Sequence, residues 1–185
     1  MTERHVVITG ISGGVGRHLA MRAMQEGYAV TGLCRTPPAD LPCETLACDV
    51  AMADQVADFV GDCPLAAHNA AFDTRFWDAE LARVARQRRQ EFACSLLLAR
   101  RLLPDAPSHK LGALVAFAGL PVAGRSHRAL ADAEMAASLL LRLEGELRTR
   151  HGVGEVSHAL LRKIQAAPKT QLERCLAAHR ETAGA

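Results

Sequence analysis

Two short motifs carry the side chains best suited to chemistry. Residues 68–73 read HNAAFD and follow an apolar run, and residues 127–132 read HRALAD and open a segment with helical spacing. Carboxylates can hold a divalent cation while an imidazole deprotonates the attacking water. If Asp73, His127 and Asp132 converge on one site, the pattern predicts metal-assisted hydrolysis.

Each of these residue types also has a plain structural interpretation. Asp73 is a suitable N-cap for the helix expected after it, and Asp132 is an acid that a helix dipole favours in a first turn. His68 is expected to form hydrogen bonds at the end of a strand. These interpretations stay open beside the catalytic one.

The two motifs resemble those of the DEDDh 3′–5′ exonucleases, the family of the proofreading epsilon subunit of bacterial DNA polymerase III. The resemblance extends over about residues 56–185 and includes FACSLLLARRLLP at 92–104 and SHKLGAL at 108–114. It implies hydrolysis at the 3′ end of single-stranded DNA, with Mg2+ or Mn2+ as cofactor and a DNA polymerase subunit as a partner.

The resemblance also implies roles for individual residues. Asp73 and Asp132 would be metal ligands, His127 the general base, and Asn69 and Phe72 part of the substrate site. One departure weakens this assignment, because the family places an Asp-x-Glu motif on its first strand and the strand expected here at 6–9 reads VVIT. We therefore expect weak metal binding and weak or absent hydrolysis.

A second motif, TGISGGVG at residues 9–16, lies between an expected strand and an expected helix. Glycines there permit a tight turn and let the backbone approach a pyrophosphate at the helix N-terminus. Over residues 5–60 the chain resembles the extended, epimerase-like short-chain dehydrogenases. The resemblance implies an NADP(H) site formed by Thr9, Gly10, Gly13, Gly14, Gly16, Arg35 and Asp49.

In that site Arg35 would favour the 2′-phosphate, and Asp49 would border the adenine. The family's catalytic Tyr-x-x-x-Lys pair is missing, because Tyr28 is the only tyrosine and Lys110 is the first lysine. The alternative is that the glycines only form a tight turn. The NADP(H) interpretation therefore predicts binding without reductase chemistry.

Hydrophobic patterning predicts an α/β fold: a Rossmann-like parallel sheet start merged with a ribonuclease-H-like exonuclease body, with a helical C-terminal third. Expected strands lie at 5–9, 28–34, 44–48, 64–69 and 91–95. Expected helices lie at 17–26, 52–60, 74–90, 96–103, 110–120 and 129–150, with two short ones after 156. We expect segments 1–60 and 61–185 to form one continuous domain in which strand 6–9 pairs with strand 64–69.

Composition narrows the classes of function. The chain has 185 residues, 49% hydrophobic and 23% charged, with a formal net charge of +2 that is too small to bind nucleic acid by bulk charge. Aromatic residues make up 4%, which argues against an extended base-stacking surface. No apolar run approaches the roughly 18 residues of a membrane span, and we expect a cytoplasmic protein. The six scattered cysteines are expected to be reduced thiols, and the arginines at 83–89 a solvated helix face.

Three interpretations remain: a nuclease with or without activity, a dinucleotide-binding protein without reductase chemistry, and a folded protein with neither property. The exonuclease interpretation covers more of the chain and is preferred.

Overall fold

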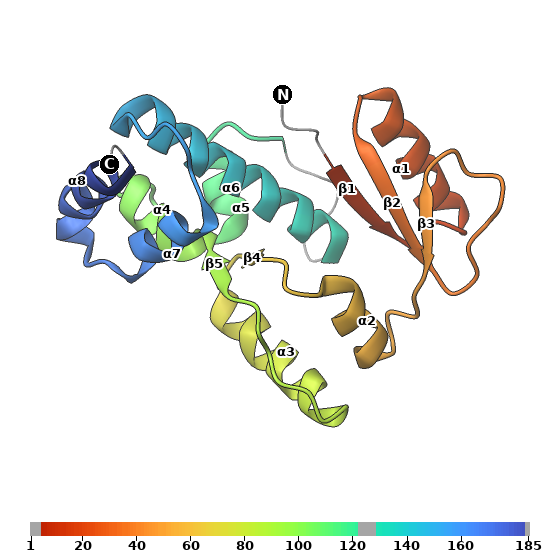
Figure 1. The fold of residues 1–185 in the computed structure, drawn as a ribbon. Coiled ribbons are helices and arrows are strands. Elements are labelled where there is room, and N and C mark those ends of the chain that lie inside the picture. Colours follow the sequence, from red (N-terminus) through yellow and green to blue (C-terminus); the bar gives the residue numbers. More distant parts are fainter. Residues whose placement is uncertain (1–4, 122–128, 184–185) are drawn as a thin grey trace. The chain divides into compact units, whose positions relative to one another are not determined.

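The computed structural model describes residues 5–121 and 129–183, and strands alternate with helices before a long helical region (Figure 1). The chain divides into two compact units. The first comprises Met1–Asp62 with Ala79–Arg88, and the second comprises Cys63–Asp78 with Arg89–Ala185. This architecture confirms the mixed α/β fold class.

The first unit is built on a parallel three-stranded sheet in the order β1-β2-β3. Its strands are β1 (His5–Thr9), β2 (Ala29–Cys34) and β3 (Glu44–Ala47). Helix α1 (Gly14–Gln25) packs on β1 and β2, and α2 (Ala53–Val60) follows β3. The buried centre of this unit is small and consists of Ile11, Ala20, Val30 and Cys34.

The second unit holds a short parallel pair of strands and most of the helices. The pair is β4 (Leu65–Ala67) with β5 (Phe92–Cys94). The helices are α3 (Ala70–Arg83), whose last turn belongs to the first unit, α4 (Ser95–Leu102), α5 (Leu111–Phe117), α6 (Ala129–His151), α7 (His158–Ala166), the 3-10 turn η1 (Lys169–Gln171) and α8 (Leu172–Ala183).

Helix α6 supplies the centre of the second core. Leu139, Leu143 and Leu147 recur every four residues and are fully buried against α4 and α5. Leu160 of α7 and Leu176 of α8 are buried in the same core. The apolar side chains after residue 156 are thus used for internal packing.

Within the two described stretches, the structure contains no helix that is both long and apolar enough to cross a membrane.

Each unit has its own parallel strands, three in the first and two in the second. The hydrogen-bonded partner of β1 is β2, and the partner of β4 is β5. The expected pairing of strand 6–9 with strand 64–69 would join the two units, and it stays a prediction. Strand β4 has only three residues, so it offers a short ladder to any neighbour.

Helix α3 begins and ends earlier than the expected span of 74–90. Asn69 takes a left-handed conformation with φ 66°, and the chain turns into the helix at Ala70. At the other end, Ala85 is left-handed with φ 54°, and the Arg86 amide donates to the Leu81 carbonyl at 2.9 Å. This is a Schellman ending with alanine in the position where glycine is usual.

Side chains of α7 complete the hydrogen bonding of the β4–β5 pair. The Gln165 amide accepts from the Cys94 N–H at 2.6 Å and donates to the Phe92 carbonyl at 3.0 Å. His158 Nε2 lies 3.0 Å from the Leu65 carbonyl oxygen. A two-stranded sheet is only marginally stable by itself, so these contacts hold it against the helices.

We expect Gln165→Met to lower the free energy of unfolding by about 2 kcal/mol, because it removes the side chain that accepts from the buried Cys94 N–H and donates to the Phe92 carbonyl. Gln171→Met, at an exposed position of η1, is the matched control and should change it by less than about 0.5 kcal/mol. Urea unfolding of both variants checks this. Equal stability of the two variants would contradict the role given to Gln165.

Candidate functional site

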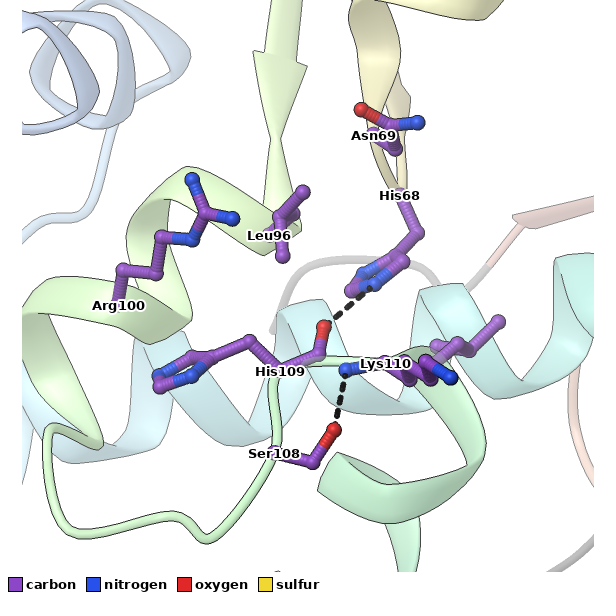
Figure 2. Close-up of a pocket in the computed structure, with 8 residues that line it drawn as sticks. His68, Asn69, Leu96, Arg100, Ser108, His109 and Lys110 are labelled. Atoms are coloured by element: carbon purple, nitrogen blue, oxygen red, sulfur yellow. Dashed lines mark hydrogen bonds between the residues drawn. The ribbon is translucent and has the colours of Figure 1, made fainter.

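A pocket of about 550 Å3 opens in the second unit, where the end of β4 meets the starts of α4 and α5 (Figure 2). The turn after β4 contributes two residues, α4 contributes two, the segment before α5 contributes three, and α5 contributes its first residue. The lining residues are His68, Asn69, Leu96, Arg100, Ser108, His109, Lys110 and Leu111.

His68 connects three parts of this pocket. Its Nδ1 lies 3.0 Å from the Ser95 Oγ, and its Nε2 lies 3.2 Å from the His109 carbonyl oxygen (Figure 2). A carbonyl can only accept, so Nε2 carries the proton and, in the neutral ring, Nδ1 accepts from the Ser95 hydroxyl. The expectation that His68 forms hydrogen bonds at the strand end is confirmed.

The charge state of His68 follows from its surroundings. Burial lowers the pKa of His68 below its ordinary value, and the nearby Arg100 guanidinium adds to this effect, as does His109 more weakly. The hydrogen bond to the His109 carbonyl and the charge of Asp73 act in the opposite direction without reversing it. At neutral pH His68 is therefore a neutral positioning group.

The pocket is electropositive. Arg100 and Lys110 line it, and none of its lining residues is acidic. Figure 2 shows the Arg100 guanidinium and the Lys110 side chain on different sides of the His68 ring. The Nε2 atom of His109 is buried and lacks a hydrogen-bond partner within the part of the chain that the structure describes.

The residues expected from the exonuclease resemblance lie on two helices and a turn. Asn69 is the exposed turn residue before α3, Phe72 is 63% exposed on that helix, and Asp73 is half-buried in its first turn. Because the helix begins at Ala70, the N-cap interpretation of Asp73 is wrong. Asp132 is half-buried in the first turn of α6, as expected, and His127 lies outside the described residues.

The described side chains do not form a binding site for a divalent metal ion. In residues 5–121 and 129–183, no three His, Cys, Asp or Glu side chains are grouped so that they could hold an ion together. Strand β1 reads HVVIT and offers no carboxylate. Asp73 and Asp132 alone do not supply the shared ligand of a two-metal site, so the described residues do not fit such a centre.

The residues expected to bind NADP(H) all lie in the first unit, around a tight strand–helix turn. Gly10 has φ 70°, and a Cβ on Gly16 would come within 2.4 Å of the Gly10 carbonyl oxygen. The turn itself therefore requires these two glycines, whether or not a ligand binds. Gly13 is the N-cap of α1, with Gly14 the first helical residue, and Thr9 ends β1.

Arg35 and Asp49, the two residues of the expected NADP(H) site outside the glycine turn, differ in their surroundings. Arg35 is exposed directly after β2. Asp49 is engaged locally, since its Oδ1 accepts from the Ala51 N–H at 3.1 Å and its own N–H donates to the Gln55 side chain at 2.7 Å. Asp49 thus shapes the turn that leads into α2.

Sequence reasoning did not single out Arg100, Lys110, Ser95 or His109 as site residues. They occur within the two segments that carry the exonuclease resemblance, but adjacent arginines gave no sign of which one faces a pocket. Arg101 is bound to the Ala167 carbonyl through Nε and a terminal nitrogen, at 2.8 and 2.6 Å. Arg100, the next residue on the helix, lines the pocket instead.

Comparison with known proteins gives one family and one solved structure. The family model RNase_T, described as "Exonuclease", matches residues 30–140. No curated protein matches the chain. A crystal structure of a putative epimerase from Burkholderia cenocepacia is similar at 24% identity, covering 80% of this chain and 50% of that one, with a TM-score of 0.26. The chain thus spans about half the length of that epimerase.

The depressed pKa of His68 predicts a loss of stability on acidification. The unfolded chain takes up this proton near the ordinary value of 6.5, whereas the folded chain takes it up at lower pH. The contribution of neutral His68 to the free energy of unfolding is complete above pH 6.5. It is lost as the pH falls toward the pKa of His68 in the folded protein.

Urea unfolding across this pH range should show that the free energy of unfolding of the wild type decreases as the pH falls. The slope of this free energy against pH should be smaller in His68→Gln. Gln171→Met, at an exposed position of η1, changes no titratable group and provides the control, which should keep the wild-type slope. If His68→Gln also kept it, His68 would not be the group responsible.

Proposed function

The chain belongs to the exonuclease family, and on this premise we propose that it binds the 3′ end of single-stranded DNA and hydrolyses it weakly or not at all. The proposed activity is that of a DEDDh exonuclease, in which Asp73, His127 and Asp132 have the roles that the motifs imply. Its substrate site would include Asn69 and Phe72.

One observation carries the expectation of weak hydrolysis. Strand β1 (HVVIT), the first strand that the structure describes, contains no acid, and no group of three metal-ligating side chains occurs among the described residues. Exonuclease domains of this family use divalent metal ions. Two isolated carboxylates lack the shared ligand that clamps the attacking and leaving oxygens during in-line displacement.

The start of α3 supports binding of a strand end. Asn69 presents its amide at the rim of the electropositive pocket. Phe72 is 63% exposed less than one turn into the helix, and an exposed phenyl ring offers a stacking surface to a base of any type. Because the apolar side chains of α7 and α8 are core residues, the proposal includes no polymerase contact there.

An assay on end-labelled single-stranded DNA tests the proposal. In either Mg2+ or Mn2+, we expect loss of 3′-terminal nucleotides to stay at the level of an Asp132→Ala variant, because the metal site is incomplete. Binding of the same DNA, followed by fluorescence anisotropy, should be retained in both proteins. Hydrolysis that the Asp132→Ala change abolishes would show that another carboxylate completes the site.

A second candidate is NADP(H) binding by the first unit, as the epimerase-like resemblance implies. Two observations favour it: the β1–α1 turn has the tight glycine geometry that a pyrophosphate needs, and Arg35 is exposed directly after β2. Without the tyrosine and lysine pair, the expected outcome is binding without reduction.

Titration with NADPH, followed by its fluorescence, distinguishes this candidate from a purely structural turn. Saturable binding should weaken in Arg35→Ala, which removes the positive charge offered to the 2′-phosphate, and should be retained in Arg22→Ala. Arg22 is an exposed residue near the end of α1 and pairs with Glu26. No saturation in the wild type would leave the glycines with their structural role alone.

A further inference from the structure

We propose that the pocket beside His68 binds the phosphate group of a ligand about the size of a nucleotide, through Arg100 and Lys110. This inference deepens the proposed function and rests on it only for the source of the phosphate, which is either a DNA strand or a free nucleotide. Of the pocket residues, only Asn69 belongs to the set that the exonuclease motifs imply.

The charges in the pocket are unbalanced. In the described stretches, neither Arg100 nor Lys110 has a carboxylate partner. Arginines of α6 are placed differently, since Arg142 and Arg150 both pair with the buried Glu146. Two cations that line one pocket without an acid repel each other and favour the entry of an anion.

The pocket is larger than an inorganic anion requires. A volume of about 550 Å3 is in the range of small-molecule sites. Leu96 and Leu111 give it apolar wall area in addition to the two cations. This combination suits a ligand with one anionic group and an organic body, such as a nucleoside monophosphate or one nucleotide of a strand.

His68 makes the site rigid but does not supply the binding charge. Both of its ring nitrogens are already engaged, by Ser95 and by the His109 carbonyl. The second contact holds the residue next to Lys110, and the Ser108 hydroxyl lies 3.4 Å from the Lys110 backbone nitrogen. These contacts fix the backbone that carries Lys110, while the Arg100 and Lys110 side chains are exposed and can reach an anion from solvent.

The test compares two double variants with the same change in charge. Arg100→Gln/Lys110→Gln removes both pocket cations. The control, Lys169→Gln/Arg174→Gln, removes two exposed cations of η1 and α8 in the same unit. Circular dichroism and thermal melting first establish that both variants are folded.

Two titrations are then made with each protein at constant ionic strength. Inorganic phosphate and 5′-dAMP are titrated into 15N-labelled protein, and the amide signals of residues 108–111 and the Arg100 Nε–H signal are followed. Single-stranded DNA is titrated over a series of salt concentrations by fluorescence anisotropy, which yields the slope of log K against log salt.

We expect 5′-dAMP to shift these signals in the wild type and the control, with an affinity at least about tenfold weaker in the pocket variant, given about 1.4 kcal/mol or more for two lost charge contacts. If the phosphate comes from DNA, the salt slope of the pocket variant should also become shallower by about 0.7, the value for one neutralised phosphate on a single strand. An unchanged slope together with lost 5′-dAMP binding would identify a free nucleotide as the source.

The inference is overturned if neither phosphate nor 5′-dAMP shifts these signals and the salt slope is the same in both variants. If the wild type binds 5′-dAMP in the pocket but no DNA, the proposed function fails while the phosphate site stands. Should the pocket variant not fold, the wild-type titrations decide, because saturable shifts at residues 108–111 support the site and their absence rejects it.

Discussion

The second unit depends on satisfying the backbone of a very short parallel sheet. Strands β4 and β5 have three residues each, so the ladder between them provides few hydrogen bonds. Buried peptide groups without partners are costly. Side chains from the helices therefore supply the missing partners: Gln165 bonds Phe92 and Cys94 of β5, and His158 bonds Leu65 of β4. The contacts that complete the sheet also attach α7 to it.

Hydrogen bonds at the end of β4 also shape the pocket. At the end of β4, His68 is drawn between the Ser95 hydroxyl and the His109 carbonyl, and burial keeps its ring neutral. This arrangement brings the start of α4 and the segment before α5 to one place. Arg100 lies on α4 and Lys110 lies directly before α5, so both line the pocket. The pocket is therefore positively charged, and none of its lining residues is acidic. A structural histidine thus determines where an anion can be bound.

The two units differ in what their motifs do. In the first, Gly10 is required by its left-handed φ of 70° and Gly16 by its close approach to the Gly10 carbonyl, so the turn explains both without a ligand. In the second, Asp73 and Asp132 lie in the first turns of α3 and α6. The strand on which the exonuclease resemblance would place a further acid reads HVVIT and belongs to the first unit. Family membership supports a nuclease-like function, and the proposal of weak hydrolysis rests on the acid missing from that strand.

Local sequence patterns determined the order of the helices and strands and the fold class. They also determined those helix ends that are marked by a glycine. Gly27 is an example, because glycine adopts φ 82° without strain and ends α1 where expected. The early end of α3 could not be predicted, since Ala85 takes the same kind of conformation without a glycine to mark it. The exonuclease motifs were likewise visible in the sequence, as was the missing acid of the first strand.

Only the tertiary structure decided which strands pair within each unit, that Asp73 lies inside a helix, and that Arg100 faces a pocket while Arg101 bonds a carbonyl. The physical reason is the same in each case. Strand pairing and side-chain burial depend on contacts between segments that are far apart in the chain. The spacing of residues along the sequence shows only which residues lie on the same face of one helix or strand.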